Sequence, residues 1–158
     1  MNTMDTSYLR QALRLASEYS AGGLNGPFGA VVVRKGVVVG RGWNRVVETG
    51  DPTAHAEILA LRDAGATLGT HLLSDCTLYS SCEPCPMCLA AVYWARIERI
   101  VYAATAGDAA EAGFDDAGIG REVALPRGER TVEEIQALGE EGREVLESWT
   151  RNPKRVQY

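Results

Sequence analysis

The sequence predicts a single α/β domain. Its 158 residues are enough to enclose one hydrophobic core. Segments with the apolar spacing of helices alternate with short β-branched runs, which is typical of α/β proteins. The chain contains no repeat, low-complexity tract or evident linker. We therefore expect residues 1–158 to form one domain, with residues 139–158 as a C-terminal helix and tail.

A first helix is predicted between Asp5 or Thr6 and the pair Gly22-Gly23. Apolar side chains recur there at the spacing of a helix that buries one face. Asp5 or Thr6 can cap the start of this helix, and the pair Gly22-Gly23 ends it. The apolar positions are Leu9, Ala12, Leu13, Ala16 and Tyr19.

Four short apolar runs predict strands. Residues 30–33 and 37–39 are β-branched and flank the turn-forming segment 34–36, which indicates a buried hairpin. Residues 77–79 and 100–104 are expected to form a third and a fourth strand. Because a helix lies between these two strands in the chain, we expect them to pair in parallel through a crossover connection.

Two further helices are predicted between the strands. Strong helix formers at 55–64 indicate a helix with Gly65 as its stop, and residues 85–95 are expected to form another. Residues 106–127 are rich in glycine, so we expect them to be mostly loop with one short helical turn.

The C-terminal third of the chain allows two interpretations. Val132, Ile135 and Leu138 lie three residues apart, as on a helix. The same segment fits an edge strand that precedes a helix from about Gly142 to Thr150. The last residues, RNPKRVQY, form a basic tail that ends in an aromatic side chain.

Composition and charge exclude several classes of protein. The 16 basic and 21 acidic residues give a net charge of −5, which argues against folded RNA as a partner because phosphate contacts need clustered Lys and Arg. No apolar run reaches the roughly 18 residues of a membrane span, and MNTMDTSYLR lacks the order of a signal peptide. We therefore expect a cytoplasmic protein with a small, neutral substrate and neither a nucleic-acid nor a membrane partner.

The cysteines and one histidine indicate a metal site. Three of the four cysteines lie within residues 82–88, which in a reducing compartment points to metal binding or catalysis rather than to disulfides. Cys85 and Cys88 follow Pro84 at a predicted helix start, where they share a face and the helix dipole favours their thiolates. His55 opens the other helix. Two helix N-termini directed at one point would assemble a zinc site from one nitrogen and two sulfurs.

The role of Cys82 separates a structural site from a catalytic one. With Cys82 as a ligand, the site would be a closed Cys3His zinc in a binding module. Because Cys82 precedes the helix, and because a closed site leaves Glu57 without a role, we favour the open alternative. Cys76 and Cys82 are then small apolar residues of a buried strand. Glu57 reaches the site if His55 lies at the helix boundary, and it can take a proton from water whose pKa zinc lowers to about 7.

The sequence also resembles a known family. HAE at 55–57 and PCPMC at 84–88 resemble the H-x-E…P-C-x-x-C signature of the cytidine deaminase superfamily of zinc deaminases. Further segments resemble its bacterial guanine deaminase branch over nearly the whole chain, least between Ile119 and Leu146. They are GPFGAVVV at 26–33, TGDPTAHAE at 49–57, SCEPCPMC at 81–88, AVYWAR at 91–96 and AEAGFDD at 110–116.

The resemblance implies both a fold and a reaction. The fold is a three-layer one, with a central mixed five-stranded sheet flanked by helices and its fifth strand around Glu134 to Leu138. The reaction is the hydrolysis of guanine to xanthine and ammonia, with Glu57 as proton shuttle and Asp116 as a second proton carrier. The implied zinc ligands are His55, Cys85 and Cys88.

The same resemblance implies a set of substrate contacts, which are Phe28, Asn44, Ala56, Trp94 and Tyr158. Each has a simpler alternative: the aromatics Phe28 and Trp94 would ordinarily be core residues, and Asn44 and Asp116 could be turn residues. A purine, however, needs aromatic faces and polar edge groups of this kind.

The C-terminal tail is expected to close over an active site. In the guanine deaminase branch this segment can be exchanged between subunits, and exchange of this kind would make the protein a homodimer. The alternative for Tyr158 is a disordered terminus. Other functions to weigh are a deaminase of cytosine or of an amino-triazine, a tRNA adenosine deaminase, and a structural zinc module.

Overall fold

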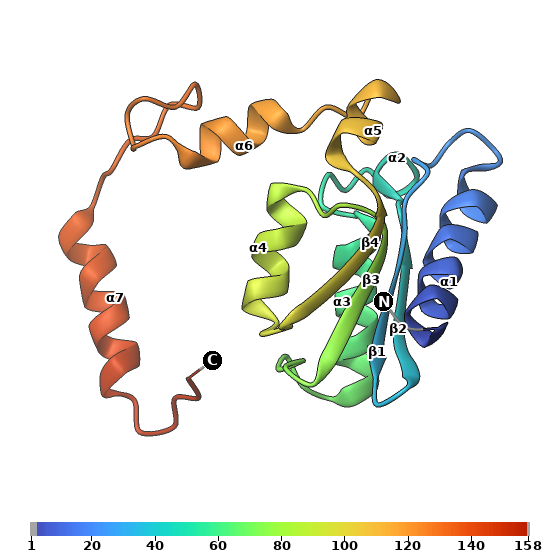
Figure 1. Ribbon diagram of the computed structural model, residues 1–158. Helices are drawn as coiled ribbons and strands as arrows, with labels where there is room; N and C mark the ends of the chain where they lie inside the picture. Colours follow the sequence, from blue (N-terminus) through green and yellow to red (C-terminus); the bar gives the residue numbers. More distant parts are fainter. Residues whose placement is uncertain (1–2, 158) are drawn as a thin grey trace. The chain divides into compact units, whose positions relative to one another are not determined.

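A mixed sheet lies between helices (Figure 1). In the computed structural model, which describes residues 3–157, the strand order is β2-β1-β3-β4. β1 pairs antiparallel with both β2 and β3, whereas β3 and β4 are parallel, as their crossover connection predicted. The strands are β1 (Gly29–Arg34), β2 (Val37–Trp43), β3 (Cys76–Cys82) and β4 (Arg99–Ala104).

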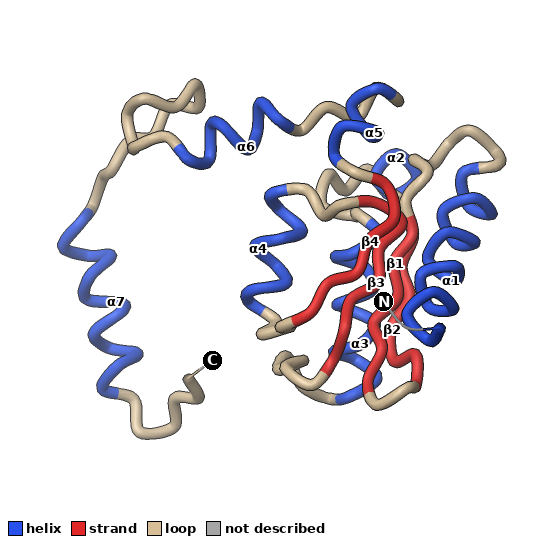
Figure 2. Tube along the Cα trace, viewed as in Figure 1, coloured by secondary structure: helices blue, strands red, loops and turns tan. Residues whose placement is uncertain are grey.

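Helices cover both faces of this sheet (Figure 2). α1 lies on one face and α3 and α4 lie on the other. The helices are α1 (Thr3–Ser20), α2 (Val46–Thr49), α3 (Ala56–Leu68), α4 (Pro86–Trp94), α5 (Ala106–Glu111), α6 (Ala117–Ala124) and α7 (Gly139–Arg151). Among residues 3–157, no helix combines the length and apolar character that a membrane crossing requires.

The core divides between the two faces of β1. Successive strand residues point to opposite faces, so Ala30 and Val32 pack toward α3 while Val31 and Val33 pack toward α1. All four are buried, which explains why this strand is a continuous apolar run rather than an alternating one.

α3 is held unusually close to β2. A Cβ atom added at Gly42 would lie only 2.1 Å from the carbonyl oxygen of Ala56 and 2.5 Å from the nitrogen of Ala60. Only a residue without a side chain therefore permits this approach. Because Ala56 is the first residue of α3, the contact fixes the end of the helix where His55 and Glu57 lie.

Two predicted helix ends are wrong. Asp5 is not a cap of α1: it lies inside the helix, 3% exposed, and its carboxylate accepts hydrogen bonds from Tyr79 Oη at 2.7 Å and from two nitrogens of Arg99 at 2.8 and 2.9 Å. α3 also runs through Gly65 and ends at Gly69, whose φ of 64° provides the left-handed C-cap. Asp5 is held inside α1 by its long-range contacts with Tyr79 and Arg99. The end of α3 is set by the left-handed backbone conformation of Gly69.

Two further predictions, both for residues after Thr105, are wrong. Residues 106–127, expected to be mostly loop, contain the helices α5 and α6, and Thr105 and Asp108 form a capping box at the start of α5. The expected fifth strand at Glu134 to Leu138 is irregular chain, so the described sheet has four strands. Leu138 has φ 52° and ψ 41°, a left-handed conformation that a strand does not contain.

The described chain separates into two compact units. The first comprises Met1–Val123 and contains the sheet with its flanking helices, and the second comprises Ala124–Tyr158 and contains α7. α7 was predicted from about Gly142 to Thr150 and extends from Gly139 to Arg151.

Candidate active site

Two helix starts bring the predicted metal ligands together. His55 is the N-cap of α3 and Cys85 the N-cap of α4, and both have extended backbone conformations, with ψ of 154° and 167°. His55 therefore lies at the helix boundary, the position required for Glu57 to reach the same site. Pro86 occupies the first turn of α4, where its missing N–H costs nothing, and Cys88 follows within that turn.

The three ligand side chains have the spacing of a tetrahedral zinc site. The ligand atoms of His55, Cys85 and Cys88 all lie within 4.8 Å of one another. His55 Nδ1 is 3.6 Å from each sulfur. Tetrahedral bonds of about 2.3 Å to sulfur and about 2.1 Å to nitrogen separate these atoms by about 3.6 Å. The donor set and its geometry therefore fit zinc.

Cys82 lies outside this cluster. It is the last residue of β3 and is 5% exposed, and its Sγ donates to the carbonyl oxygen of Thr105 at 3.5 Å. Cys76, at the other end of β3, is also buried. The position of Cys82 leaves the cluster with three ligand side chains, which is the number found in zinc sites that keep a position for water.

The two thiols are electrostatically different. The pKa of Cys85 falls to about 4, chiefly because the Cys88 thiol donates a hydrogen bond to it and also because the His55 ring lies beside it. The pKa of Cys88 is raised, first by that same hydrogen bond and then by burial. A divalent cation bound by both cysteines would displace the protons of their thiols. The pKa of His55 is raised, mainly by its contact with Cys85.

Glu57 is buried next to the cluster. Its side chain is 5% exposed, Oε2 lies 3.5 Å from Cys88 Sγ, and Oε1 accepts a hydrogen bond from Ser80 Oγ at 3.0 Å. Burial raises the pKa of this carboxyl group. A buried carboxyl group directed at a metal site can both accept and return a proton.

A cavity of about 550 Å³ opens onto this site. Six of the site residues predicted from the sequence line it, namely Phe28, Asn44, His55, Glu57, Cys85 and Asp116. Phe28 meets Phe114 edge to face, with ring centroids 4.9 Å apart. This contact anchors the segment that carries Asp116, because Phe114 and Asp116 are separated by a single residue.

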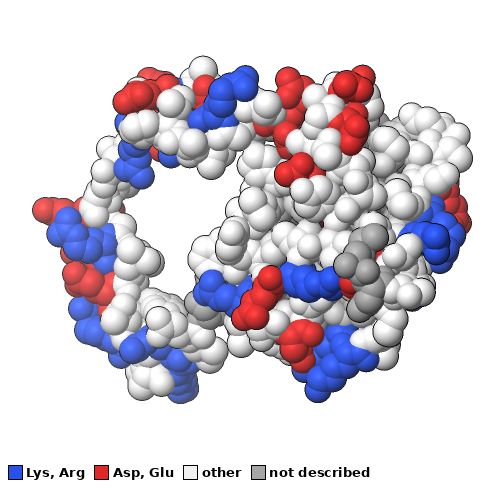
Figure 3. All heavy atoms as spheres, viewed as in Figure 1, with Lys and Arg blue, Asp and Glu red and all other residues white. Residues whose placement is uncertain are grey.

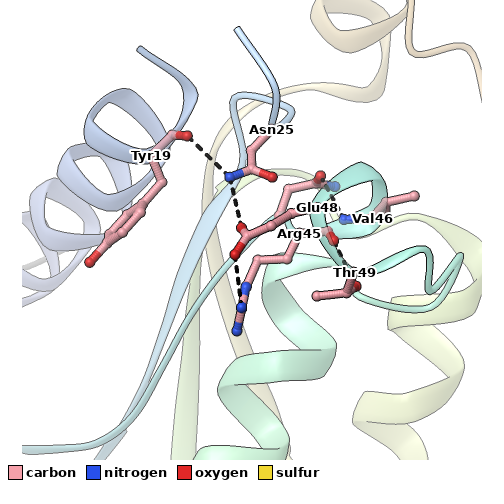
Figure 4. A network of polar contacts seen from close by, with 7 residues as sticks. Tyr19, Asn25, Arg45, Val46, Glu48 and Thr49 are labelled. Carbon is pink, nitrogen blue, oxygen red and sulfur yellow. Dashed lines mark hydrogen bonds and ion pairs between the residues drawn. The ribbon is translucent and has the colours of Figure 1, made fainter. Parts of the chain in front are cut away.

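A polar network holds one wall of the cavity (Figure 4). Asn25 Nδ2 donates to the carbonyl oxygen of Tyr19 at 3.4 Å and to Glu48 Oε2 at 3.2 Å. Glu48 Oε1 in turn accepts from Arg45 Nη2 at 2.8 Å. The network therefore ties the loop 21–28 to α2, and residues of both segments line the cavity.

The orientation of the Asn44 amide follows from its backbone partners. Asn44 is 8% exposed, and its Oδ1 accepts from the main-chain nitrogens of Gly26 at 3.3 Å and Val46 at 3.4 Å. Because Oδ1 is engaged, Nδ2 is the group that Asn44 can offer to a molecule in the cavity. Asn44 thus joins the two segments that form the wall and provides a hydrogen-bond donor there.

Of the predicted substrate contacts, Ala56 and Trp94 are not among the residues that line the cavity. Ala56 is fully buried at the start of α3, and Trp94 is 64% exposed at the far end of α4 from Cys85. Tyr158 lies outside the described residues. These three assignments stay predictions.

Other cavity and site residues were missed from the sequence. Phe114 and Asn25 line the cavity, and Ser80 contacts Glu57. A buried serine in a strand of apolar neighbours was a usable signal, because such a hydroxyl group needs a partner. No local signal identifies Asn25, whose partner Glu48 lies 23 residues further along the chain.

The geometry and the comparisons with known proteins define the class. Residues 2–104 match the cytidine and deoxycytidylate deaminase zinc-binding region, and the chain belongs to this family. It is 46% identical to the guanine deaminase of Bacillus subtilis (strain 168) over 96% of this chain and 97% of that protein.

Solved structures place the chain in the same group. The X-ray structure of guanine deaminase from Bacillus subtilis matches with a TM-score of 0.93 at 46% identity, covering 100% of this chain and 99% of that one. The structure of NE0047 in complex with 2,6-diaminopurine matches with a TM-score of 0.68 at 38% identity, covering 73% of this chain and 64% of that one. The tRNA-specific adenosine deaminase of Aquifex aeolicus is 41% identical over 61% of this chain and 64% of that protein.

Proposed function

We propose that this protein hydrolyses guanine to xanthine and ammonia with a zinc ion bound by His55, Cys85 and Cys88. The observation that carries the proposal is the placement of the buried Glu57 carboxylate beside the three ligands, at a cavity lined by aromatic and amide side chains. The near full-length similarity to the Bacillus subtilis guanine deaminase supports the choice of substrate.

The proposed chemistry divides between the metal and Glu57. A zinc ion held by these ligands would lower the pKa of a water molecule enough for that water to act as a nucleophile near neutral pH. Glu57 takes the proton that this water loses and delivers it to the ring nitrogen beside the attacked carbon. It then assists the departure of ammonia, with Asp116 as a second proton carrier. Both carboxylates line the same cavity, so a bound base can contact each of them.

Recognition of the base is assigned to the cavity walls. Asn44 offers Nδ2 to an acceptor on the purine, because its Oδ1 is held by Gly26 and Val46. Phe28, supported edge-on by Phe114, provides an apolar wall for the ring. We include Ala56, Trp94 and Tyr158 as further substrate contacts.

We also propose that the protein forms a homodimer. The helix α4 exposes Leu89 by 39%, Tyr93 by 68% and Trp94 by 64%, and adjacent exposed apolar side chains of this size mark association surfaces. We propose that residues 139–158 form a segment that closes over an active site, that of the partner subunit if the segment is exchanged. Sedimentation analysis should then give a dimer.

The charge around the cavity favours a free base over tRNA. On the face drawn in Figure 3, acidic side chains gather around α5, the helix whose Ala106 and Ala109 line the cavity. Asp108 and Glu111 belong to this helix, and Glu83 lies next to it, accepting from Ala106 N at 3.0 Å. Negative charge at the entrance opposes a phosphate backbone but not a neutral purine.

One assay separates the alternatives. Zinc-loaded protein is incubated in parallel with guanine, cytosine, adenine, an amino-triazine and an anticodon stem that contains adenosine, and released ammonia is measured. We expect release from guanine. Release from the RNA stem or from another base alone would reassign the substrate, and no release from any of them would favour the structural zinc module.

A further inference from the structure

The position of Ser80 at the centre of the sheet is not explained by packing alone. It lies in β3 opposite Ala30 of β1 and Tyr102 of β4, and it is 1% exposed. Its Oγ donates to Glu57 Oε1 at 3.0 Å. An alanine would fill almost the same volume without a hydroxyl group to satisfy, so the hydrogen bond is the feature that serine adds.

The neighbouring Ser81 shows the alternative use of a buried serine. Ser81 is 4% exposed and points to the opposite face of the sheet, where its Oγ accepts from the main-chain nitrogen of Gly29 at 3.0 Å. That bond joins two strands and has no contact with the metal ligands in the described structure. The bond of Ser80 instead ends on the carboxylate beside Cys88.

The contact makes the two oxygens of Glu57 unequal. Oε1 is held by Ser80, whereas Oε2 is directed at Cys88 Sγ, 3.5 Å away. The terminal torsion of a glutamate is otherwise broad and nearly two-fold, so the helix backbone alone does not fix the plane of the carboxylate. Proton transfer needs that plane fixed to within about 10–20°.

We propose that Ser80 is a positioning residue for Glu57. Its hydroxyl group holds Oε1 so that Oε2 remains the oxygen directed at the metal site and at the base. The proposal rests on the proposed function only in naming what Glu57 does; the positioning itself is a property of the two side chains.

The test compares Ser80→Ala and Ser80→Thr with Ser81→Ala as the matched control. For each zinc-loaded variant, kcat per bound zinc, KM for guanine and zinc content are measured. We expect Ser80→Ala to lower kcat about 10- to 100-fold, the effect of losing one hydrogen bond to a charged group, with KM and zinc content within about twofold of wild type. Ser80→Thr, which retains the hydroxyl group, should recover most of the rate. Ser81→Ala should leave kcat per zinc within about twofold.

Crystal structures of the wild type and Ser80→Ala give a second readout. We expect the Glu57 carboxylate to rotate or to occupy more than one orientation in the variant. An unchanged carboxylate, an unchanged kcat per zinc, or loss of zinc from Ser80→Ala alone would overturn the proposal. If the wild type releases no ammonia from guanine, the proposed function fails, and the Glu57 orientation in these structures still decides the role of Ser80.

Discussion

Glu57 combines a buried position with the need to carry charge. Its side chain is 5% exposed, and burial raises its pKa, so its retention beside three metal ligands requires a functional explanation. We expect Glu57→Gln to keep the shape of the site and one acceptor oxygen for Ser80. Because glutamine cannot shuttle a proton, kcat should fall about 10²- to 10⁴-fold while zinc content stays at one per chain. Activity that survives in the zinc-loaded variant would remove Glu57 from the proton path.

The cysteines offer a matched pair for testing ligand identity. Cys82 Sγ contacts the carbonyl oxygen of Thr105, whereas Cys88 Sγ lies 3.6 Å from His55 Nδ1. Cys82→Ser should therefore leave zinc content and kcat within about twofold, and Cys88→Ser should lower zinc affinity at least about tenfold. Metal analysis after dialysis against a weak chelator measures both. Loss of zinc from Cys82→Ser would restore the closed-site alternative.

At the scale of elements, the starts of α3 and α4 were predictable because they are local features. Pro84 and Pro86 flank the first cysteine of the helix, and His55 directly precedes a run of strong helix formers. The cavity wall was harder to predict from the sequence, because the contacts of Asn25 with Glu48 and of Phe28 with Phe114 join segments that are distant in the chain. The prediction of a fifth strand was wrong for a related reason. Strand formation depends on a pairing partner, which the periodicity of the sequence does not reveal.

Gly42 allows the close contact between β2 and the start of α3, the helix whose N-cap is the candidate ligand His55. A Cβ at this position would lie 2.1 Å from the carbonyl oxygen of Ala56, so Gly42→Ala must push the start of α3 away from β2. We expect a loss of about 1–3 kcal/mol in the free energy of unfolding, and weaker zinc binding because His55 moves with the helix. Thermal unfolding and zinc titration measure the two effects. Gly22→Ala is the control, since a Cβ there meets nothing within 4 Å; an equal effect of both changes would contradict this account.

At the scale of the whole molecule, the described hydrogen bonds and ring contact of the tail join residues of one compact unit. The main-chain nitrogens of Lys154 and Arg155 bond to Asn152, at 2.9 and 3.1 Å, and the Arg155 guanidinium lies over the Trp149 ring. These contacts stay within the second compact unit, whereas the ligand cluster and the cavity belong to the first. Stability and catalysis should therefore respond differently when the tail is shortened.

Deletion of the residues after Pro153 tests this separation. Because the described contacts that are lost, those of Lys154 and Arg155, are local and exposed, the free energy of unfolding should change by no more than about 0.5 kcal/mol. If the tail closes over an active site, kcat/KM for guanine should fall at least about tenfold, because water is then less well excluded from the bound base. Tyr158→Phe separates the ring from its hydroxyl group and should cost less than the deletion. Stopped assays of ammonia release, run beside thermal unfolding, measure both quantities, and a truncated chain with unchanged kcat/KM would place Tyr158 outside the site.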